Sequence, residues 1–311
     1  MGVQRRTLPP ARGMIRQAVI LDAPPAGSSA LARLTAEIGR HGVGTVSILA
    51  QNETPPIDDR AFVLDGAGWL DINLWDLALA AGDGSILAVD AAGAPGGAAV
   101  MDRHRLERSG GLSRSLLARL AAEPDMPRRP YDRPRLDPTR DILRGAVIFD
   151  RDGVLNEDTE YPHRPDQIVW TATAKAAVKA VNDAGLYAFV ATNQSGVARG
   201  FYSEQDIFAL HAWMNGELIA AGAHIDAFEH SPFHPDGAVE AYRRDSDCRK
   251  PGPGMLIRLM AAHGVDRRRT VMVGDRAGDV EAGRAAGVAG LLFEGGDLAA
   301  FLAPVLARLA R

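Results

Sequence analysis

The second half of the sequence alternates short apolar runs with amphipathic segments, and this alternation limits the fold more than any other feature. A strand–helix alternation of this kind is typical of a parallel sheet covered by helices on both faces. The expected strands end at Asp150 or cover residues 186–191, 225–229, 270–273 and 288–293, and the expected helices cover residues 172–184, 253–263 and 298–309, with one more opening at Ser203. The sequence therefore predicts an α/β domain with a doubly wound parallel sheet at residues 142–311.

The first part of the chain predicts a smaller α/β domain at residues 1–123. A strand at 17–22, a helix that Ser28 or Ser29 could cap and strands at 44–50 and 61–65 form a βαβ start, which favours a parallel sheet. The remainder is rich in glycine and predicts loops, closed by a helix at 113–122. Alternating prolines and charged residues at 124–141 predict an extended, solvated linker.

Composition excludes several classes of function. The net charge of −4 over 311 residues argues against nucleic acid as the main partner. A single cysteine excludes an internal disulfide framework and suits a reducing compartment. No apolar run approaches the ~18 residues of a membrane span. We therefore expect a cytoplasmic protein without a membrane or nucleic-acid partner.

Polar motifs follow four of the predicted strands in the second domain. They are Asp150 with Asp152, residues 192–196 (Thr-Asn-Gln-Ser-Gly), residues 249–251 (Arg-Lys-Pro) and residues 274–275 (Gly-Asp). Each motif alone could be a turn, a helix cap or a surface loop. In a parallel sheet, however, the carboxyl ends of the strands meet at one edge. Three carboxylates there favour Mg²⁺, and a lysine with a hydroxyl beside them favours a phosphoryl group.

These motifs resemble those of the haloacid dehalogenase (HAD) superfamily phosphatases. Residues 149–156, 192–200 and 248–255 are most similar to the branch of the D-glycero-D-manno-heptose 1,7-bisphosphate 7-phosphatases, in which histidinol-phosphate phosphatase is the nearest relative. The resemblance covers residues 143–295. It implies a HAD-like doubly wound sheet and a phosphoric monoester hydrolase of nucleotide-activated heptose and lipopolysaccharide biosynthesis, acting on a small sugar bisphosphate.

The resemblance also implies a mechanism. Asp150 attacks phosphorus and forms an aspartyl-phosphate, while Asp152 protonates the leaving oxygen and later activates water. Mg²⁺ is held by the Asp150 carboxylate, the Asp152 backbone carbonyl and Asp275. Thr192 and Lys250 hold the phosphoryl oxygens.

Further residues are implied as substrate contacts. By the same resemblance, the sugar or its second phosphate is bound by Asp158, Tyr161, Asn193, Ser195, Arg199, Arg249 and Arg276. The family usually has lysine at the place of Arg276. Asp279 either supports Lys250 or the metal, or is a plain helix-face aspartate. Two other interpretations stay open: a phosphatase for histidinol phosphate or another small phosphomonoester, and a scaffold or regulatory protein with an inert N-terminal domain.

A loop before the lysine motif departs from these relatives, which carry a zinc site there. Ser231, Phe233 and Ser246 stand at three of the four ligand places, and Cys248 alone remains. One thiolate cannot make a four-ligand structural zinc site. We predict a zinc-free loop held by packing of Phe233, with His234 a surface or packing residue.

The N-terminal domain resembles a sugar-1-phosphate nucleotidyltransferase in its opening strand and in residues 62–73. Its first loop, residues 22–29, lacks the glycines and the arginine that would cradle a nucleoside triphosphate, and Ala67 stands at the place of the metal-binding aspartate. The sequence thus predicts a degenerate domain. Its expected role is dimerisation into a homodimer or docking; a folding appendage is the alternative.

Overall fold

The computed structural model describes residues 15–21, 23–49, 57, 59–113, 115–133, 136–137 and 143–309. The chain divides into two compact units, Met1–Ile142 and Leu143–Arg311. Asp22 at the end of the first predicted strand and residues 134–135 and 138–141 of the predicted linker lie outside the described residues. Within the described part of the chain, no helix has both the length and the apolar character needed to cross a bilayer.

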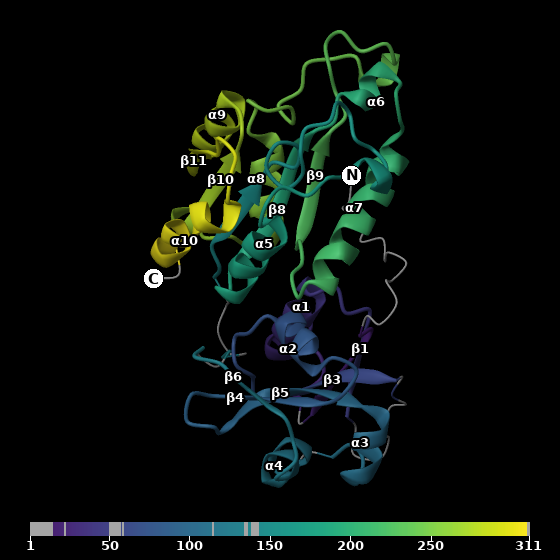
Figure 1. Ribbon diagram of the computed structural model, residues 1–311, viewed down its shortest axis with the longest axis vertical. Helices are drawn as coiled ribbons and strands as arrows, with labels where there is room; N and C mark the ends of the chain where they lie inside the picture. Colours follow the sequence, from purple (N-terminus) through teal and green to yellow (C-terminus); the bar gives the residue numbers. More distant parts are fainter. Residues whose placement is uncertain are drawn as a thin grey trace. The chain divides into compact units, whose positions relative to one another are not determined.

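The C-terminal unit is built on a five-stranded sheet in which all strands run parallel, in the order β11-β10-β7-β8-β9 (Figure 1). The strands are β7 (Ala146–Phe149), β8 (Tyr187–Asn193), β9 (Ala227–Ser231), β10 (Thr270–Gly274) and β11 (Ala289–Leu292). β7 and β10 are short and buried along their whole length, as expected for strands covered on both faces. The predicted doubly wound parallel sheet is confirmed.

Helices cover both faces of this sheet. They are α5 (Ala174–Asp183), α6 (Gly196–Arg199), α7 (Glu204–Ala220), α8 (Gly254–His263), α9 (Ala277–Ala285) and α10 (Leu298–Leu309), with short 3-10 turns η1 (Pro165–Gln167), η2 (Glu240–Tyr242) and η3 (Arg267–Arg269). Because side chains alternate along a strand, Val147 and Phe149 of β7 pack with α5 and α10, whereas Ile148 packs with α8 and α9. The two hydrophobic layers hold β7 rigidly, and with it the residues that follow its end.

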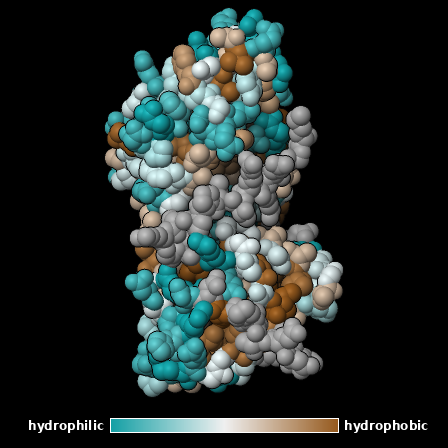
Figure 2. All heavy atoms as spheres, turned by 90° about the vertical axis from the view of Figure 1, so that its right-hand side faces the viewer, coloured by the Kyte–Doolittle hydropathy of each residue, from teal (hydrophilic) through white to brown (hydrophobic). Residues whose placement is uncertain are grey.

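The described surface of this unit is mainly hydrophilic on the face shown in Figure 2, where hydrophobic residues lie in small separate patches. Phe201 and Phe208 are among the large apolar side chains that stay exposed. The Phe201 ring meets the Tyr161 ring edge-on at 5.0 Å between centroids. Isolated exposed apolar residues are ordinary on a protein surface.

The N-terminal unit has a six-stranded sheet in the order β2-β1-β3-β5-β4-β6. Its elements are β1 (Gln17–Leu21), α1 (Ser29–Arg40), β2 (Thr45–Ile48), β3 (Arg60–Asp65), α2 (Leu74–Ala81), β4 (Ile86–Val89), β5 (Pro95–Asp102), α3 (Arg103–Arg108), α4 (Leu116–Ala122) and β6 (Arg128–Pro130). β1 pairs in parallel with β2 and β3, as the βαβ start predicts. Ser28 caps α1 by accepting a hydrogen bond from the backbone N–H of Leu31.

Two expectations for this unit were wrong. The glycine-rich stretch is not loop: β4 and β5 form an antiparallel hairpin, and β5 also runs antiparallel to β3, so the sheet is mixed. Gly93 turns the hairpin at φ +86°, and a Cβ at Gly96 would lie 2.7 Å from the Leu70 side chain, so these glycines serve a turn and a close contact. Part of the predicted linker is also strand, since β6 pairs with β4 at the sheet edge, where proline is tolerated.

Candidate active site

The motifs predicted at four strand ends come together around one pocket of about 560 Å³ in the C-terminal unit. Its walls come from the segments after β7, β8, β9 and β10, which lie side by side in the sheet. The predicted site residues in the pocket wall are Asp150, Asp152, Asp158, Tyr161, Thr192, Asn193, Ser195, Arg199, Arg249, Lys250 and Arg276. Asp275 is the one predicted residue outside this wall, and its carboxylate adjoins that of Asp150.

Carboxylates and a single lysine form the buried floor of the pocket. Lys250 Nζ lies 2.6 Å from Asp150 Oδ2 and 2.6 Å from Asp279 Oδ1, and all three side chains are buried. Burial raises the pKa of Asp150 to about 7, although the neighbouring Lys250 cation acts in the opposite direction. Burial, followed by the charge of Asp279, also raises the pKa of Asp275. Asp279 therefore supports Lys250, which is the first of its two open interpretations.

These carboxylates fit a divalent metal ion. One ligand atom from each of Asp150, Asp275 and Asp279 lies within 4.8 Å of the others. Asp275 Oδ1 is buried and has no hydrogen-bond partner among the described residues. A Cβ at Gly153 would lie 2.2 Å from Asp275 Oδ2, so only glycine lets the chain pass this close. Oxygen ligands with an excess of negative charge suit Mg²⁺.

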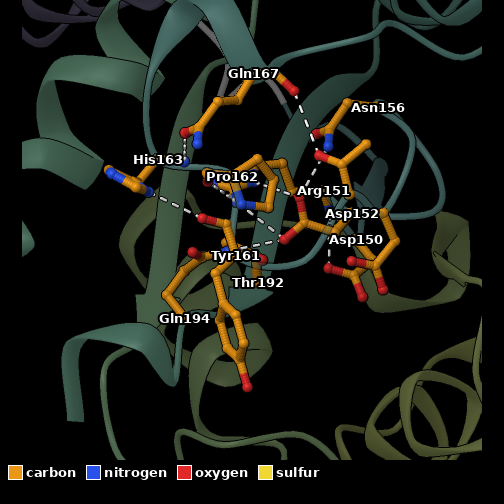
Figure 3. Close-up of polar contacts among 12 residues, drawn as sticks. Asp150, Arg151, Asp152, Asn156, Tyr161, Pro162, His163, Gln167, Thr192 and Gln194 are labelled. Atoms are coloured by element: carbon orange, nitrogen blue, oxygen red, sulfur yellow. Dashed lines mark hydrogen bonds and ion pairs between the residues drawn. The ribbon is translucent and has the colours of Figure 1, made fainter. Parts of the chain in front are cut away.

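The Asp152 carboxylate is held by donors from three side chains (Figure 3). Arg151 donates from Nε to Oδ1 at 3.0 Å and from Nη2 to Oδ2 at 2.9 Å. Asn156 donates to Oδ1 at 2.9 Å, and Gln194 donates to Oδ2 at 3.1 Å. Arg151 is fully buried and also donates to the Pro162 carbonyl, so it ties Asp152 to the following loop. A bidentate arginine pair fixes both the position and the plane of a carboxylate.

Asn193 joins two of the strand ends. Its side chain donates to the Lys250 carbonyl at 3.0 Å and accepts from the Lys250 backbone N–H at 3.0 Å. This reciprocal pair holds the lysine loop against the end of β8. Asn193 was predicted as a substrate contact. It lines the pocket, but the nitrogen and the oxygen of its side-chain amide each already have a backbone partner in Lys250.

A second group of cations lies in the pocket wall away from Lys250. Arg199 Nη2 lies 3.4 Å from His234 Nε2, and Arg249 is half-buried beside them. Burial lowers the pKa of Arg249, and the charge of Arg199 lowers it further. Neither arginine has a carboxylate partner among the described residues. Two cations held together without an anion make this wall attractive to a negatively charged group.

Arg276 and Asp158 were predicted as separate substrate contacts, but they contact each other. Arg276 Nη2 lies 2.6 Å from Asp158 Oδ2, and the arginine side chain is 71 % exposed. An exposed pair of this kind is weak and can open at little cost. Both residues still line the pocket.

The loop after β9 is packed as predicted around Phe233. The Arg244 guanidinium lies 4.0 Å from the centroid of the Phe233 ring, and the centroid of the Tyr242 ring lies 6.1 Å from the Phe233 centroid. Cys248 Sγ accepts a hydrogen bond from Arg258 at 2.7 Å. The absence of zinc stays a prediction. His234 has a more specific place than expected, because its side chain lines the pocket.

Sequence reasoning assigned no site role to five further residues in the pocket wall, namely Glu160, Gln194, Tyr202, His234 and Gly278. Gln194 lies inside the motif at residues 192–196, so its position in the sequence could have indicated a place in the pocket. Tyr202 precedes the cap of α7 and gave none. Glu160 and Tyr161 both have φ +57°, which is unusual for residues other than glycine and often marks a functional loop.

Comparisons with known proteins find HAD-like phosphatases. A HAD-hydrolase-like family model matches residues 247–300. The D-glycero-beta-D-manno-heptose-1,7-bisphosphate 7-phosphatase of Rhodopseudomonas palustris is 45% identical over 54% of this chain and 93% of its own length. The corresponding alpha-named enzyme of Photorhabdus laumondii is 36% identical over 46% of this chain and 78% of its own. A putative HAD-like phosphatase from Mesorhizobium loti, solved by crystallography, is 31% identical with a TM-score of 0.51, covering 54% of this chain and 88% of that one.

Proposed function

The chain belongs to the HAD-like heptose-bisphosphate phosphatase family and is a phosphoric monoester hydrolase, and from this premise we propose that it removes the 7-phosphate of D-glycero-D-manno-heptose 1,7-bisphosphate. A bisphosphate is proposed because one pocket has two separate groups of positively charged side chains. Lys250 and Thr192 lie beside Asp150, and Arg199 and Arg249 lie in another part of the wall. One place suits the phosphate that reacts, and the other suits a phosphate that stays.

In the proposed reaction, an Asp150 carboxylate oxygen attacks phosphorus as the bond from phosphorus to the sugar oxygen breaks. Asp152 gives its proton to the departing oxygen, which leaves as the sugar hydroxyl. Asp152 then takes a proton from water, and the resulting hydroxide attacks the aspartyl-phosphate. The Asp150–phosphorus bond breaks, inorganic phosphate leaves and both side chains return to their first state.

The surrounding residues have supporting roles in this proposal. Thr192 and Lys250 bind the oxygens of the transferring phosphoryl group, and Asp279 holds the Lys250 ammonium in place. Asp150, Asp275 and the Asp152 backbone carbonyl would hold Mg²⁺, with Asp279 beside them. When bound, Mg²⁺ supplies positive charge that offsets the negative charge of the carboxylates and the phosphoryl oxygens.

Phosphate release in Mg²⁺ buffer tests the proposal. The α and β anomers of the bisphosphate are compared with heptose 1-phosphate, heptose 7-phosphate and histidinol phosphate. We expect kcat/KM to be highest for one of the bisphosphates, because only they can occupy both cationic places. A preference for histidinol phosphate would contradict the substrate, while leaving the phosphatase assignment intact.

Asp150→Asn tests the nucleophile. It removes the attacking oxygen's charge with little change in shape, and we expect phosphate release to fall by roughly 10⁴-fold or more, as for other nucleophile substitutions. Trapping of ³²P on the wild-type chain after acid quenching, and its loss in the variant, would identify the covalent intermediate. Undiminished phosphate release by the variant would refute the role of Asp150 as nucleophile.

Dimerisation through the N-terminal unit is a separate proposal, which the mass of the full chain in solution tests.

A further inference from the structure

Gln194 is a buried amide that lies between Asp152 and Thr192, two residues of the proposed mechanism. We propose that Gln194 is a positioning residue that holds Asp152 and Thr192 in one arrangement, and that Tyr202 sets the orientation of its amide. The inference rests on the proposed function, because it takes Asp152 as the proton carrier and Thr192 as a phosphoryl-binding group.

The Gln194 amide makes three hydrogen bonds in the pocket wall. Figure 3 shows Gln194 beside Asp152 and Thr192. Nε2 donates to Asp152 Oδ2 at 3.1 Å and to the Thr192 hydroxyl oxygen at 2.9 Å. Oε1 accepts from the Tyr202 hydroxyl at 2.9 Å. The side chain is buried, with only 1 % of the residue exposed. Both hydrogens and the oxygen of the amide are therefore engaged, and the group has one orientation.

The chemistry of the partners decides that orientation. Both Asp152 oxygens already accept hydrogen bonds from Arg151, so the amide atom that faces Oδ2 is the one that donates, the nitrogen. The oxygen then faces Tyr202, which must donate. Burial raises the pKa of Tyr202 to about 12, so its hydroxyl keeps its proton at neutral pH. Space for this ring comes from Gly196, where a Cβ would lie 2.3 Å from two ring atoms of Tyr202.

Gln194 also determines the direction of the Thr192 hydroxyl. The Thr192 hydroxyl oxygen accepts a hydrogen bond from Gln194, so the hydroxyl hydrogen is left to donate to another group. It has no acceptor among the described residues. Both side chains line the pocket, where a phosphoryl oxygen would be such an acceptor. A single amide thus couples the proton carrier to the group that grips the phosphoryl oxygens.

Loss of Gln194 should impair the reaction more than the fold. Arg151 and Asn156 still hold Asp152 when the amide is removed. What is lost is the second of the two hydrogen bonds to Oδ2 and the hydrogen bond to the Thr192 hydroxyl oxygen. A misplacement of about 1 Å can cost on the order of 100-fold in rate.

Gln194→Met keeps the length of the side chain and removes the amide. We expect kcat/KM for the heptose bisphosphate to fall on the order of 100-fold. The loss should be smaller for p-nitrophenyl phosphate, because its leaving group departs without a proton from Asp152 and only the effect on Thr192 remains. Tyr202→Phe should follow the same pattern with a smaller loss, about fivefold, the worth of one neutral hydrogen bond.

Gln194→Glu distinguishes positioning from packing. The protonated glutamic acid can still donate a hydrogen bond to Asp152, whereas the ionised form repels it. The rate relative to wild type should therefore rise as pH falls. Asn182→Leu is the matched control, because Asn182 is a buried amide at the other end of the sheet that accepts from the His224 backbone N–H. This control should lower the melting temperature and leave the ratio of the two substrates unchanged.

Three outcomes would overturn the inference: wild-type rates in Gln194→Met, an equal loss on both substrates, or a Gln194→Glu profile parallel to wild type. Each of these would leave the proposed function standing if Asp150→Asn and Asp152→Asn are inactive. If instead those two variants hydrolyse the bisphosphate normally, the proposed function itself fails. The two failures are therefore distinguishable.

Discussion

The two units of this chain both bury carboxylates, but they treat the charge differently. In the N-terminal unit, buried Asp76 accepts from Tyr131 at 2.8 Å and lies 3.3 Å from Arg129. Asp102 accepts from Ser85 at 2.6 Å and from the Arg105 backbone N–H at 2.8 Å. These donors come from the same unit and join strand to helix or strand to strand. The carboxylates there complete the fold.

In the C-terminal unit, two carboxylates share one buried cation, and a third carboxylate lies next to them. Asp150 and Asp279 both contact Lys250, and Asp275 adjoins them with one oxygen that has no partner among the described residues. This arrangement costs stability unless a ligand joins it. The comparison indicates that a functional site is identified by buried polar groups that lack hydrogen-bond or ion-pair partners. The number of buried polar groups is less informative.

Among tests of this comparison, the largest expected effect is the change in kcat when one carboxylate is removed from each unit. Asp275→Asn should lower kcat by roughly 10²–10³-fold, the cost of losing one group that organises charge at the reaction. It should also weaken the rise in melting temperature that Mg²⁺ produces. Asp65→Asn is the control, because Asp65 caps its own turn through the Ala67 backbone N–H. Unaltered Mg²⁺ dependence in Asp275→Asn would contradict the metal site.

The next largest effect is a loss in the free energy of unfolding when one buried cation is removed from each unit. Lys250→Met leaves two buried carboxylates without a counter-charge, and we expect the free energy of unfolding to fall by about 3–5 kcal/mol. Arg105→Met in the N-terminal unit should cost about 1 kcal/mol, because its partners Glu123 and Asp125 are 29 % and 79 % exposed. Urea unfolding of the metal-free chain measures both. Equal losses would show that the two clusters do not differ as argued.

The smallest effect is a pH dependence of opposite sign in the two units. Burial raises the pKa of Asp150 from 3.8 to about 7, so its contribution to stability is fully present below pH ~4 and is lost as pH rises through about 7. For Asp102, burial acts to raise the pKa, but hydrogen bonds from Ser85 and Arg105 outweigh it and lower the pKa. Its contribution is present above pH ~4 and is lost as pH falls through the lowered pKa.

Melting temperatures of the metal-free protein measure this difference. Relative to Asp150→Asn, the wild type should lose stability between pH ~4 and pH ~7. Relative to Asp102→Asn, the wild type should lose stability as pH falls below ~4. If both comparisons have the same sign, the two carboxylates are not in opposed environments.

Much of the C-terminal unit could be predicted because its signals are local. Apolar runs such as residues 146–149 and the cap at Ser203 determine where elements begin and end, and the capping box with Asp206 is present as expected. The β4–β5 hairpin could not be predicted in the same way. Its glycines indicate loops locally, and only the contact between Gly96 and Leu70 shows why one of them lies inside a strand.

The sequence by itself determined the order of strands and helices, and therefore which residues follow the strand ends of a parallel sheet. It placed Asp150, Thr192, Lys250 and Asp275 at one edge, since the carboxyl ends of parallel strands must meet there. Only the tertiary structure decided which side chains contact one another. Whether Asp279 contacts Lys250, or Gln194 contacts Asp152, depends on distances between side chains from segments far apart in the chain, and spacing along the sequence does not determine those distances.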